Sequence, residues 1–350
     1  MSTDISQRKA DHIDLAARGD VGFRHTTTLF ECVRLVHDAL PEAHLDELDT
    51  SVTLLGKRLR APIVIAAMTG GTPRAGALNR ELAALAERRG YGFGLGSQRA
   101  MHLDQGRGET YAVRDVAPSA LVLGNVGVVQ ARALATAELR ALADRVGADA
   151  LCVHLNPAME VVQPGGDRDF RGGLETLARL ARELGLPLIA KETGCGLSRP
   201  VVRRLYEAGV RHVDVSGAGG TSWVAVETQR AEGDAKALGQ AFWDWGVPTA
   251  ASVVYAAQEP FETVIATGGV QNGLDVAKAL ALGAHAAGLA RPVLKALVNE
   301  GAEAADRFLD QVEAELRTAM LLTGSRRAHD LRRAGRVLTG ELRDWVAAGS

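Results

Sequence analysis

Eight short apolar runs, spread along the chain at regular intervals, constrain the fold of this sequence more than any other feature. Runs of this length are typical of strands that are buried on both faces, as in a parallel sheet. Most of them are separated by segments whose apolar residues recur at helical spacing. This alternation predicts a (β/α)8 barrel, also called a TIM barrel. The predicted strands lie within residues 61–71, 91–99, 119–127, 151–166, 186–196, 211–223, 261–273 and 285–294.

The two ends of the chain do not follow this alternation. Residues 1–60 are predicted to form an N-terminal extension, in which residues 33–42 make a layer that precedes the barrel. The barrel is expected to occupy about residues 61–300. A C-terminal helical segment, about residues 301–350, is expected to pack on it through the amphipathic helix 302–321. The sequence contains no linker or low-complexity tract, so all 350 residues are predicted to form one domain.

The composition excludes several classes of protein. The formal net charge of −2 gives no general attraction to nucleic acid or to anionic membranes. No apolar run approaches the roughly 18 residues of a membrane-spanning helix, and the N-terminus lacks the apolar core of a secretory signal. The cysteines Cys32, Cys152 and Cys195 have no zinc-like spacing and cannot all pair internally. We therefore expect a cytoplasmic protein without nucleic-acid or membrane partners.

Polar residues at the end of the fourth predicted strand mark the expected active site. Catalytic side chains of such barrels lie where the strands end, and here His154, Asn156 and Glu160 follow an apolar run. His154 and Asn156 alternate along the strand and can face the same side, either in the site or as hydrogen-bonded core groups. Glu160 offers hard oxygen ligands for Mg²⁺ if a diphosphate supplies the others, although most glutamates are simply solvated.

Two glycine-rich strand ends predict a phosphate site. Residues 268–269 follow the seventh strand, and residues 217–220 contain three glycines after the sixth. Without a Cβ the backbone can approach an anion closely, and barrel loops at this position often bind phosphate. Lys191 lies in an apolar context on the fifth strand. It either places a cation beside an electron-rich cofactor ring or forms an ion pair with Glu192 or Asp214.

A basic cluster occurs near the start of the chain, in the segment RKADHI. If residues from Ser6 onward are helical, Arg8, Lys9 and His12 lie near one another on one face. Taken alone, the cluster is also compatible with the solvated start of a helix.

Together these motifs resemble the type 2, FMN-dependent isopentenyl diphosphate isomerases over nearly the whole chain. The motifs GAGGTSW and SQR are specific to that family, whereas ATGG occurs in many flavin-binding barrels. The other matching segments are RKADHI, VRLVHDALPE, AAMTGGT, HLNP with Glu160, QPGGDRDFRG, KETGCGLS, DWGVPT and LDVAKALALGA. The resemblance implies a homo-oligomeric barrel, a tetramer or an octamer, that interconverts isopentenyl and dimethylallyl diphosphate. It also implies reduced FMN and Mg²⁺ as cofactors, with NADPH or another reductant keeping the FMN reduced.

The resemblance assigns roles to individual residues. Lys191 corresponds to the lysine beside the flavin ring, and Glu160 corresponds to the metal ligand. The other expected flavin contacts, of which the last five lie at the phosphate end, are Ala67, Met68, Thr69, Ser97, Asn125, Ser216, Thr221, Gly268, Gly269, Val270, Ala290 and Arg291. The expected substrate contacts are Arg8, Lys9, His12, Ser97, Gln98, Arg99, His154 and Met159.

One departure from the family pattern concerns the expected catalytic residues, which are His154, Met159 and Lys191. The family usually has glutamine where this chain has Met159, and a thioether is a weak acceptor and neither an acid nor a base. We therefore expect a working but slower isomerase, in which the flavin carries the essential proton chemistry and His154 or a bound water covers part of the other transfer. The alternatives are an FMN-dependent oxidoreductase of the hydroxy-acid oxidase or dihydroorotate type and a non-catalytic flavoprotein.

Overall fold

The computed structural model describes the backbone of residues 2–348 and the side chains of Lys9 and residues 11–348. Its central strands form a closed barrel of eight parallel strands, and each strand lies inside one of the predicted runs to within one residue, which confirms the (β/α)8 fold. The last strand pairs with the first and closes the barrel, with Gly288 opposite Val64. In chain order the barrel strands are β4 (Ile63–Ile65), β5 (Gly92–Gly94), β6 (Leu121–Gly127), β7 (Ala150–Leu155), β8 (Leu188–Glu192), β9 (His212–Asp214), β10 (Thr263–Ala266) and β11 (Ala286–Leu289).

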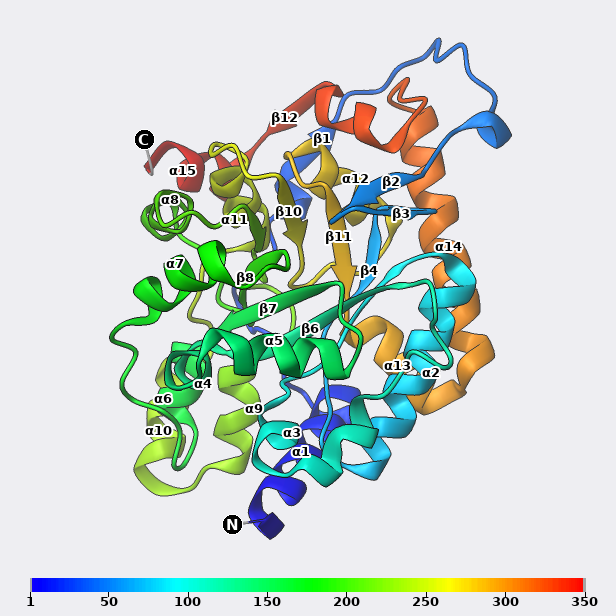
Figure 1. The fold of residues 1–350 in the computed structure, drawn as a ribbon. Coiled ribbons are helices and arrows are strands. Elements are labelled where there is room, and N and C mark those ends of the chain that lie inside the picture. The colour runs from blue at the N-terminus through cyan, green and yellow to red at the C-terminus, as the bar shows by residue number, and fades with distance from the viewer. Residues whose placement is uncertain (1, 349–350) are drawn as a thin grey trace.

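Helices surround the barrel, and a second set of helices lies at one of its ends (Figure 1). The surrounding helices are α2 (Pro73–Arg89), α5 (Thr136–Arg145), α7 (Gly173–Glu183), α8 (Arg199–Glu207), α11 (Thr249–Ala256), α12 (Gly273–Ala281), α13 (Arg291–Glu300) and α14 (Ala302–Leu321). The second set lies at the C-terminal ends of the barrel strands. It consists of α1 (Ser2–Arg18), α3 (Arg99–Leu103), η3 (Gln105–Tyr111), α4 (Val128–Ala133), α6 (Pro157–Val162), α9 (Trp223–Arg230) and α10 (Gly233–Ala241). Helix α14 has the bounds that the amphipathic stripe predicts.

Side-chain alternation along the strands explains why polar groups collect at one end. On β6, Leu123 packs inside the barrel, whereas Val122 packs outward against the helices. Asn125 is the next inward position after Leu123, and Lys191 likewise follows the inward Ile189 on β8. The barrel interior is therefore apolar through its middle and polar only where the strands end.

A hairpin covers the opposite end of the barrel interior. It consists of β2 (Val52–Leu54) and β3 (Lys57–Leu59), which pair antiparallel. Its side chains Leu54 and Leu59 are buried in the same cluster as the inward-facing strand residues. The hairpin thus closes the N-terminal end of the barrel to solvent.

The N- and C-terminal segments meet in a second small sheet. Strand β1 (Val33–Leu35) pairs antiparallel with β12 (Arg336–Leu338), beside α15 (Gly340–Ala348) and the short helices η1 (Phe30–Cys32), η2 (Leu45–Glu47) and η4 (Ala328–Arg333). The C-terminal segment therefore contains a strand as well as the predicted helices. The predicted layer at residues 33–42 is wrong beyond β1, because Val36 is 50% exposed and Leu40 is 83% exposed.

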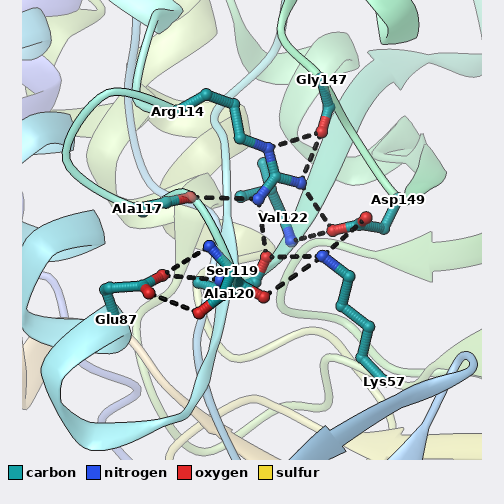
Figure 2. A network of polar contacts seen from close by, with 9 residues as sticks. All are labelled: Lys57, Glu87, Arg114, Ala117, Ser119, Ala120, Val122, Gly147 and Asp149. Carbon is teal, nitrogen blue, oxygen red and sulfur yellow. Dashed lines mark hydrogen bonds and ion pairs between the residues drawn. The ribbon is translucent and has the colours of Figure 1, made fainter.

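A network of charged residues joins the loops that enter β6 and β7 (Figure 2). Arg114 donates to the carbonyl oxygens of Ala117, Ala120 and Gly147 and forms an ion pair with Asp149 at 2.7 Å. Lys57 from the hairpin pairs with the other oxygen of Asp149 at 2.9 Å. The network thus ties the hairpin to the N-terminal end of the barrel. Among the described residues, no helix is both long and apolar enough to cross a membrane.

Candidate active site

A cavity opens at the C-terminal ends of the barrel strands and extends under helix α1. It brings together most of the residues that the sequence indicates. These are Lys9, His12, Ala67, Met68, Thr69, Ser97, Arg99, Asn125, His154, Met159, Glu160, Lys191, Ser216, Thr221, Gly268, Gly269, Val270, Ala290 and Arg291. The side chain of Arg8 lies outside the described part of the chain.

Gln98 differs from the other predicted site residues, because it does not line the cavity. Its side chain is fully buried, with Nε2 donating to the carbonyl oxygen of Leu142 at 2.9 Å and Oε1 accepting from the backbone N–H of Asn125 at 2.9 Å. The geometry therefore favours a structural role, in which Gln98 fixes the end of β6 rather than contacting substrate.

One end of the cavity is made of closely packed glycine backbone. Gly268 and Gly269 have φ values of 96° and 72°, a region that favours glycine. A Cβ on Gly220 would lie 2.3 Å from the backbone nitrogen of Gly269, and one on Gly268 would lie 2.2 Å from the carbonyl oxygen of Gly217. Helix α13 begins beside these loops, and at its start the N–H groups lack intrahelical partners, apart from Pro292, which has no N–H. Such an end suits the oxygens of a phosphate.

Lys191 enters the barrel mouth from the end of β8. Its Nζ lies 2.9 Å from Asp214 Oδ2 and 3.3 Å from Thr267 Oγ1, and Thr267 donates to the other oxygen of Asp214 at 2.5 Å. All three side chains are buried, but only Lys191 and Thr267 line the cavity. Of the two carboxylates considered above, Asp214 is thus the partner. The ammonium has three donors, so this arrangement leaves one for a ligand.

Glu192 turns the other way and organises the loop after β8. Its Oε2 accepts the backbone N–H groups of Thr193, Gly194, Cys195 and Gly196. Burial raises the pKa of this carboxyl to about 7, although the four donors and Lys191 act in the opposite direction. Thr193 and Gly194 line the cavity, so Glu192 sets the shape of that part of its wall.

His154 is held by the strand beside it. Its Nδ1 lies 2.8 Å from Asn125 Oδ1, which is an acceptor, so Nδ1 carries the proton and Nε2 is free of one. The amide nitrogen of Asn125 is in turn fixed by the carbonyl oxygen of Leu95. Burial, with the nearby charges of Lys191, Lys9 and Arg99, lowers the pKa of His154 to about 3. The imidazole is therefore neutral at ordinary pH and a weak base.

Glu160 is buried on α6 and held by several donors. Asn156 Nδ2 donates to Oε1 at 3.0 Å, and the backbone N–H of Asp167 donates to Oε2 at 2.8 Å. Asn156 therefore acts here as a partner of the carboxylate. No cluster of three histidine, cysteine or acidic residues among the described side chains could hold a metal by itself. A metal at Glu160 needs ligands from a bound anion, as the sequence predicts.

The basic rim of the cavity comes from α1 and α3. Arg99 forms an ion pair with Asp167 at 3.6 Å, and both groups are partly exposed. Lys9 and His12 reach the cavity from α1, and His12 Nε2 lies 2.7 Å from Glu227 Oε1. Burial lowers the pKa of His12 despite this contact.

Trp223 lines the cavity and Glu227 lies behind it as the partner of His12, and the motifs single out neither residue. Glu227 is fully buried on α9 beside His12 and Arg230, and these partners outweigh burial and hold the pKa of its carboxyl below the usual range. Trp223 lines the cavity and packs edge-on against His12. Trp223 is the last residue of the GAGGTSW motif, so the sequence offers a signal for it. Glu227 follows the motif in a helical segment that has no distinctive pattern.

The cavity fits the cofactor that the sequence predicts. The hydroxyl oxygen of Thr69 is buried at the end of β4 and has no hydrogen-bond partner among the described residues, so it can receive a polar group from a ligand. The glycine-lined end and the ammonium of Lys191 lie in the same cavity. The residues present can therefore hold a phosphate at one end and the edge of a polar ring near the barrel axis.

The barrel with this cavity belongs to the FMN-dependent dehydrogenase family, whose model matches residues 1–155 and 158–337. Within that class, the chain belongs with the proteins named isopentenyl-diphosphate delta-isomerase. It is 45% identical to the one from Methanococcoides burtonii, over 99% of this chain and 96% of the relative. It is 44% identical to the one from Halobacterium salinarum, over 99% and 97% of the two chains. The family assignment that the motifs predict is thereby confirmed.

Solved structures share the fold at much lower sequence identity. A mandelate oxidase variant with a C4a-OH-FMN adduct has a TM-score of 0.65 at 20% identity, with 96% of this chain and 99% of that chain covered. A lactate oxidase of Pediococcus acidilactici has a TM-score of 0.67 at 16% identity, with 97% and 94% covered. These similarities establish the common barrel and carry no further conclusion about activity.

Proposed function

We propose that this protein is an FMN-dependent isomerase that interconverts isopentenyl diphosphate and dimethylallyl diphosphate. The observation that carries the proposal is that one cavity joins a glycine-lined end, the buried ammonium of Lys191 and a basic rim with one buried glutamate. The name shared by the full-length relatives supports this substrate and reaction.

The cofactor end is assigned to the loops after β9, β10 and β11. Gly268, Gly269 and the start of α13 would hold the phosphate, and Thr69 would receive a polar atom of the ring. The ion pair with Asp214 would hold the Nζ of Lys191 beside the ring. Reduced FMN, when bound, supplies proton-transfer chemistry that the apolar and weakly basic side chains of this cavity lack.

The substrate diphosphate is assigned to the opposite, basic rim. Lys9 and Arg99 carry positive charge there, and the long contact between Arg99 and Asp167 can be exchanged for a closer one with an anion. Glu160 is oriented in advance by Asn156 and Asp167, so it can share a Mg²⁺ ion with the diphosphate. Anchoring at this end fixes the hydrocarbon end of the substrate in the interior.

The reacting carbons are assigned to the space between these two ends. Moving a double bond requires adding a proton at one carbon and removing one at another, through a carbocation-like state that must be kept from water. Met159 and Trp223 contribute apolar and aromatic surface to the cavity, and α1 covers it. His154, with a pKa of about 3, is suited to accepting a hydrogen bond rather than removing a proton.

The proposal extends to properties of the whole molecule. We propose that NADPH or another reductant keeps FMN reduced in the cytoplasm and that the 350-residue chain is one domain. We also propose that the chain assembles into a tetramer or an octamer, which sedimentation equilibrium of the holoprotein would measure.

The deciding experiment uses holoprotein with photoreduced FMN, Mg²⁺ and isopentenyl diphosphate in D₂O. We expect dimethylallyl diphosphate that carries deuterium, and heat denaturation should release FMN rather than FAD. If no isomerisation occurs at saturating FMN, Mg²⁺ and isopentenyl diphosphate, the protein is a non-catalytic flavoprotein. Turnover of a 2-hydroxy acid in air, without isomerisation, would favour an oxidoreductase instead. The loop after β10, residues 267–272, contains neither histidine nor arginine, which argues against that alternative.

A further inference from the structure

Arg291 lies at the junction of two parts of the site that have separate roles. It is the first residue of α13 and therefore belongs to the cavity end that the sequence assigns to phosphate. Its guanidinium does not stay at that end. Nε donates to the carbonyl oxygen of Ala16 at 2.9 Å, and Nη2 donates to that of Gly19 at 2.5 Å.

These two carbonyl groups belong to the C-terminal end of α1. The last carbonyl groups of a helix have no intrahelical partner, and a cation there also interacts favourably with the helix dipole. Helix α1 packs against α13 and carries Lys9, His12, Ile13 and Ala16 into the cavity. Arg291 therefore fastens the helix that supplies part of the basic rim.

Helix α1 has further attachments to α2 and α9, among them an ion pair between Asp11 and Arg230 at 3.1 Å. Asp14 pairs with Arg74 on α2 at 2.8 Å, but both groups are about half exposed, so this contact is weak. His12 contacts Glu227 on α9. The Arg291 contact joins the end of α1 to the start of α13, and its partly buried charge is costly to leave without acceptors.

We infer that Arg291 is a positioning residue that couples occupation of the phosphate end to the placement of α1 over the cavity. This inference rests on the proposed function for the identity of the ligand, FMN. A phosphate held at the start of α13 would fix the backbone of Arg291. A fixed backbone stabilises the arrangement in which the guanidinium holds the end of α1. The binding of cofactor thereby prepares the rim that receives the second anion.

The test compares the hydrogen exchange of residues 2–18 with and without FMN, in the absence of substrate. In the unmodified protein FMN should slow exchange throughout α1. In Arg291→Ala this response should disappear, and the affinity for FMN should fall only by the reciprocal of the lost coupling, about 5- to 10-fold, because the guanidinium bonds α1 rather than the phosphate. Arg291→Lys keeps the charge but not the two-pronged geometry and should restore only part of the response.

Kinetics provide a second readout. We expect Arg291→Ala to raise the KM for isopentenyl diphosphate about tenfold, with a smaller change in kcat, because the loss of two charge-assisted hydrogen bonds misplaces Lys9 and His12 without touching the reacting carbons. Arg317→Ala is the matched control. Arg317 also donates to two backbone carbonyl groups, those of Leu45 and Leu48, but does so outside the cavity. It should change neither the FMN response nor the KM.

Three results would overturn the coupling. The first is that FMN still slows exchange in α1 of Arg291→Ala, and the second is that the unmodified protein binds FMN but its α1 does not respond. The third is that Arg291→Ala loses FMN affinity by more than about 30-fold while exchange in α1 is unchanged, which would mean that Arg291 contacts the phosphate directly. Failure of the unmodified protein to bind FMN at all would instead overturn the proposed function.

Discussion

Arg114 and Arg99 lie at opposite ends of the barrel and differ in how fully their donors are used. Arg114, where strands begin, donates to three carbonyl oxygens and pairs with Asp149 at 2.7 Å (Figure 2). Arg99, where strands end, forms a 3.6 Å ion pair with Asp167 and is 38% exposed. A fully bonded arginine stabilises the fold, whereas an arginine with a long, exchangeable contact is available to an incoming anion.

A partly buried carboxyl group at one end and a buried one at the other show the same contrast. Burial would raise the pKa of Asp149, but the N–H of Val122 and the cations of Lys57 and Arg114 outweigh burial and lower it. At the mouth, burial dominates for Glu192 and raises the pKa to about 7. Asp149 is therefore compensated by its neighbours, whereas Glu192, behind the wall of the cavity, keeps a raised pKa of the kind found near binding sites.

The largest effect is expected on stability, from removing Arg114 at the end of the barrel where the strands begin. Arg114→Ala leaves Asp149 and the carbonyl groups of the loop with fewer donors, so we expect a loss of about 3 kcal/mol in the free energy of unfolding. Urea denaturation measures it, and KM and kcat of the folded enzyme should not change. Arg203→Ala, which removes an exposed pair with Glu207 on α8, is the control and should cost less than about 0.5 kcal/mol. Equal losses in the two variants would contradict the comparison.

The corresponding change at the mouth should affect substrate binding instead. Arg99→Ala should raise the KM for isopentenyl diphosphate roughly 10- to 100-fold, because one charge-assisted contact contributes about 1.5–3 kcal/mol. The flavin spectrum and the free energy of unfolding should stay close to those of the unmodified protein. A normal KM would remove Arg99 from the diphosphate site.

Glu192 should make the free energy of unfolding depend on pH. Its folded-state pKa of about 7 lies above the ordinary value of 4.5, so between these values the folded state holds a proton that the unfolded state has lost. The associated stability is complete below about pH 4.5 and is lost progressively as the pH rises through 7. Glu192→Gln cannot titrate, so its unfolding free energy should vary less over this range. Identical pH profiles would show that Glu192 is not the titrating group.

A smaller effect is expected at the metal position. Glu160→Gln keeps the shape of the side chain and removes its negative charge, so the Mg²⁺ concentration that gives half-maximal activity should rise by about tenfold or more. Glu175→Gln, on the exposed first turn of α7, provides a control for the loss of one negative charge. Coincident metal titrations of the unmodified protein and Glu160→Gln would exclude this ligand.

The smallest effect concerns Met159. Met159→Gln introduces the glutamine that the family usually has, at similar volume, and should raise kcat by several-fold. This is less than the roughly 10²-fold that a positioned acid or base contributes at the low end of its range. Met159→Leu, which has neither an amide nor a thioether, should leave kcat near that of the unmodified protein. A lower kcat for Met159→Gln than for Met159→Leu would mean that the cavity is adapted to the apolar side chain.

The sequence predicts the barrel well because buried parallel strands have a clear signature. Each strand is a short apolar run that ends in polar residues or glycine, as in β8, where Leu188–Ala190 precedes Lys191. The segment at residues 33–42 has a similar apolar content, but Val36 and Leu40 are exposed. Composition over ten residues does not distinguish a buried strand from a surface loop unless tertiary partners are known.

The site is less predictable than the fold because side-chain direction depends on partners far away in the chain. Ser97, Gln98 and Arg99 are consecutive in the SQR motif, but only the first and third line the cavity. Arg291 stands next to the predicted phosphate loop, yet its guanidinium bonds the end of α1, some 270 residues earlier. Neither outcome follows from local spacing.

The pairing of β1 with β12 has a consequence for how the chain acquires its structure during synthesis. Val33 pairs with Leu338, so β1 finds its partner only after about 300 further residues have been made. At about 5–20 residues per second this interval lasts roughly 15–60 s. Throughout that time the N-terminal strand presents unpaired backbone groups on the nascent chain. The interval is a period in which a chaperone that binds extended segments has access to a surface that the finished protein conceals.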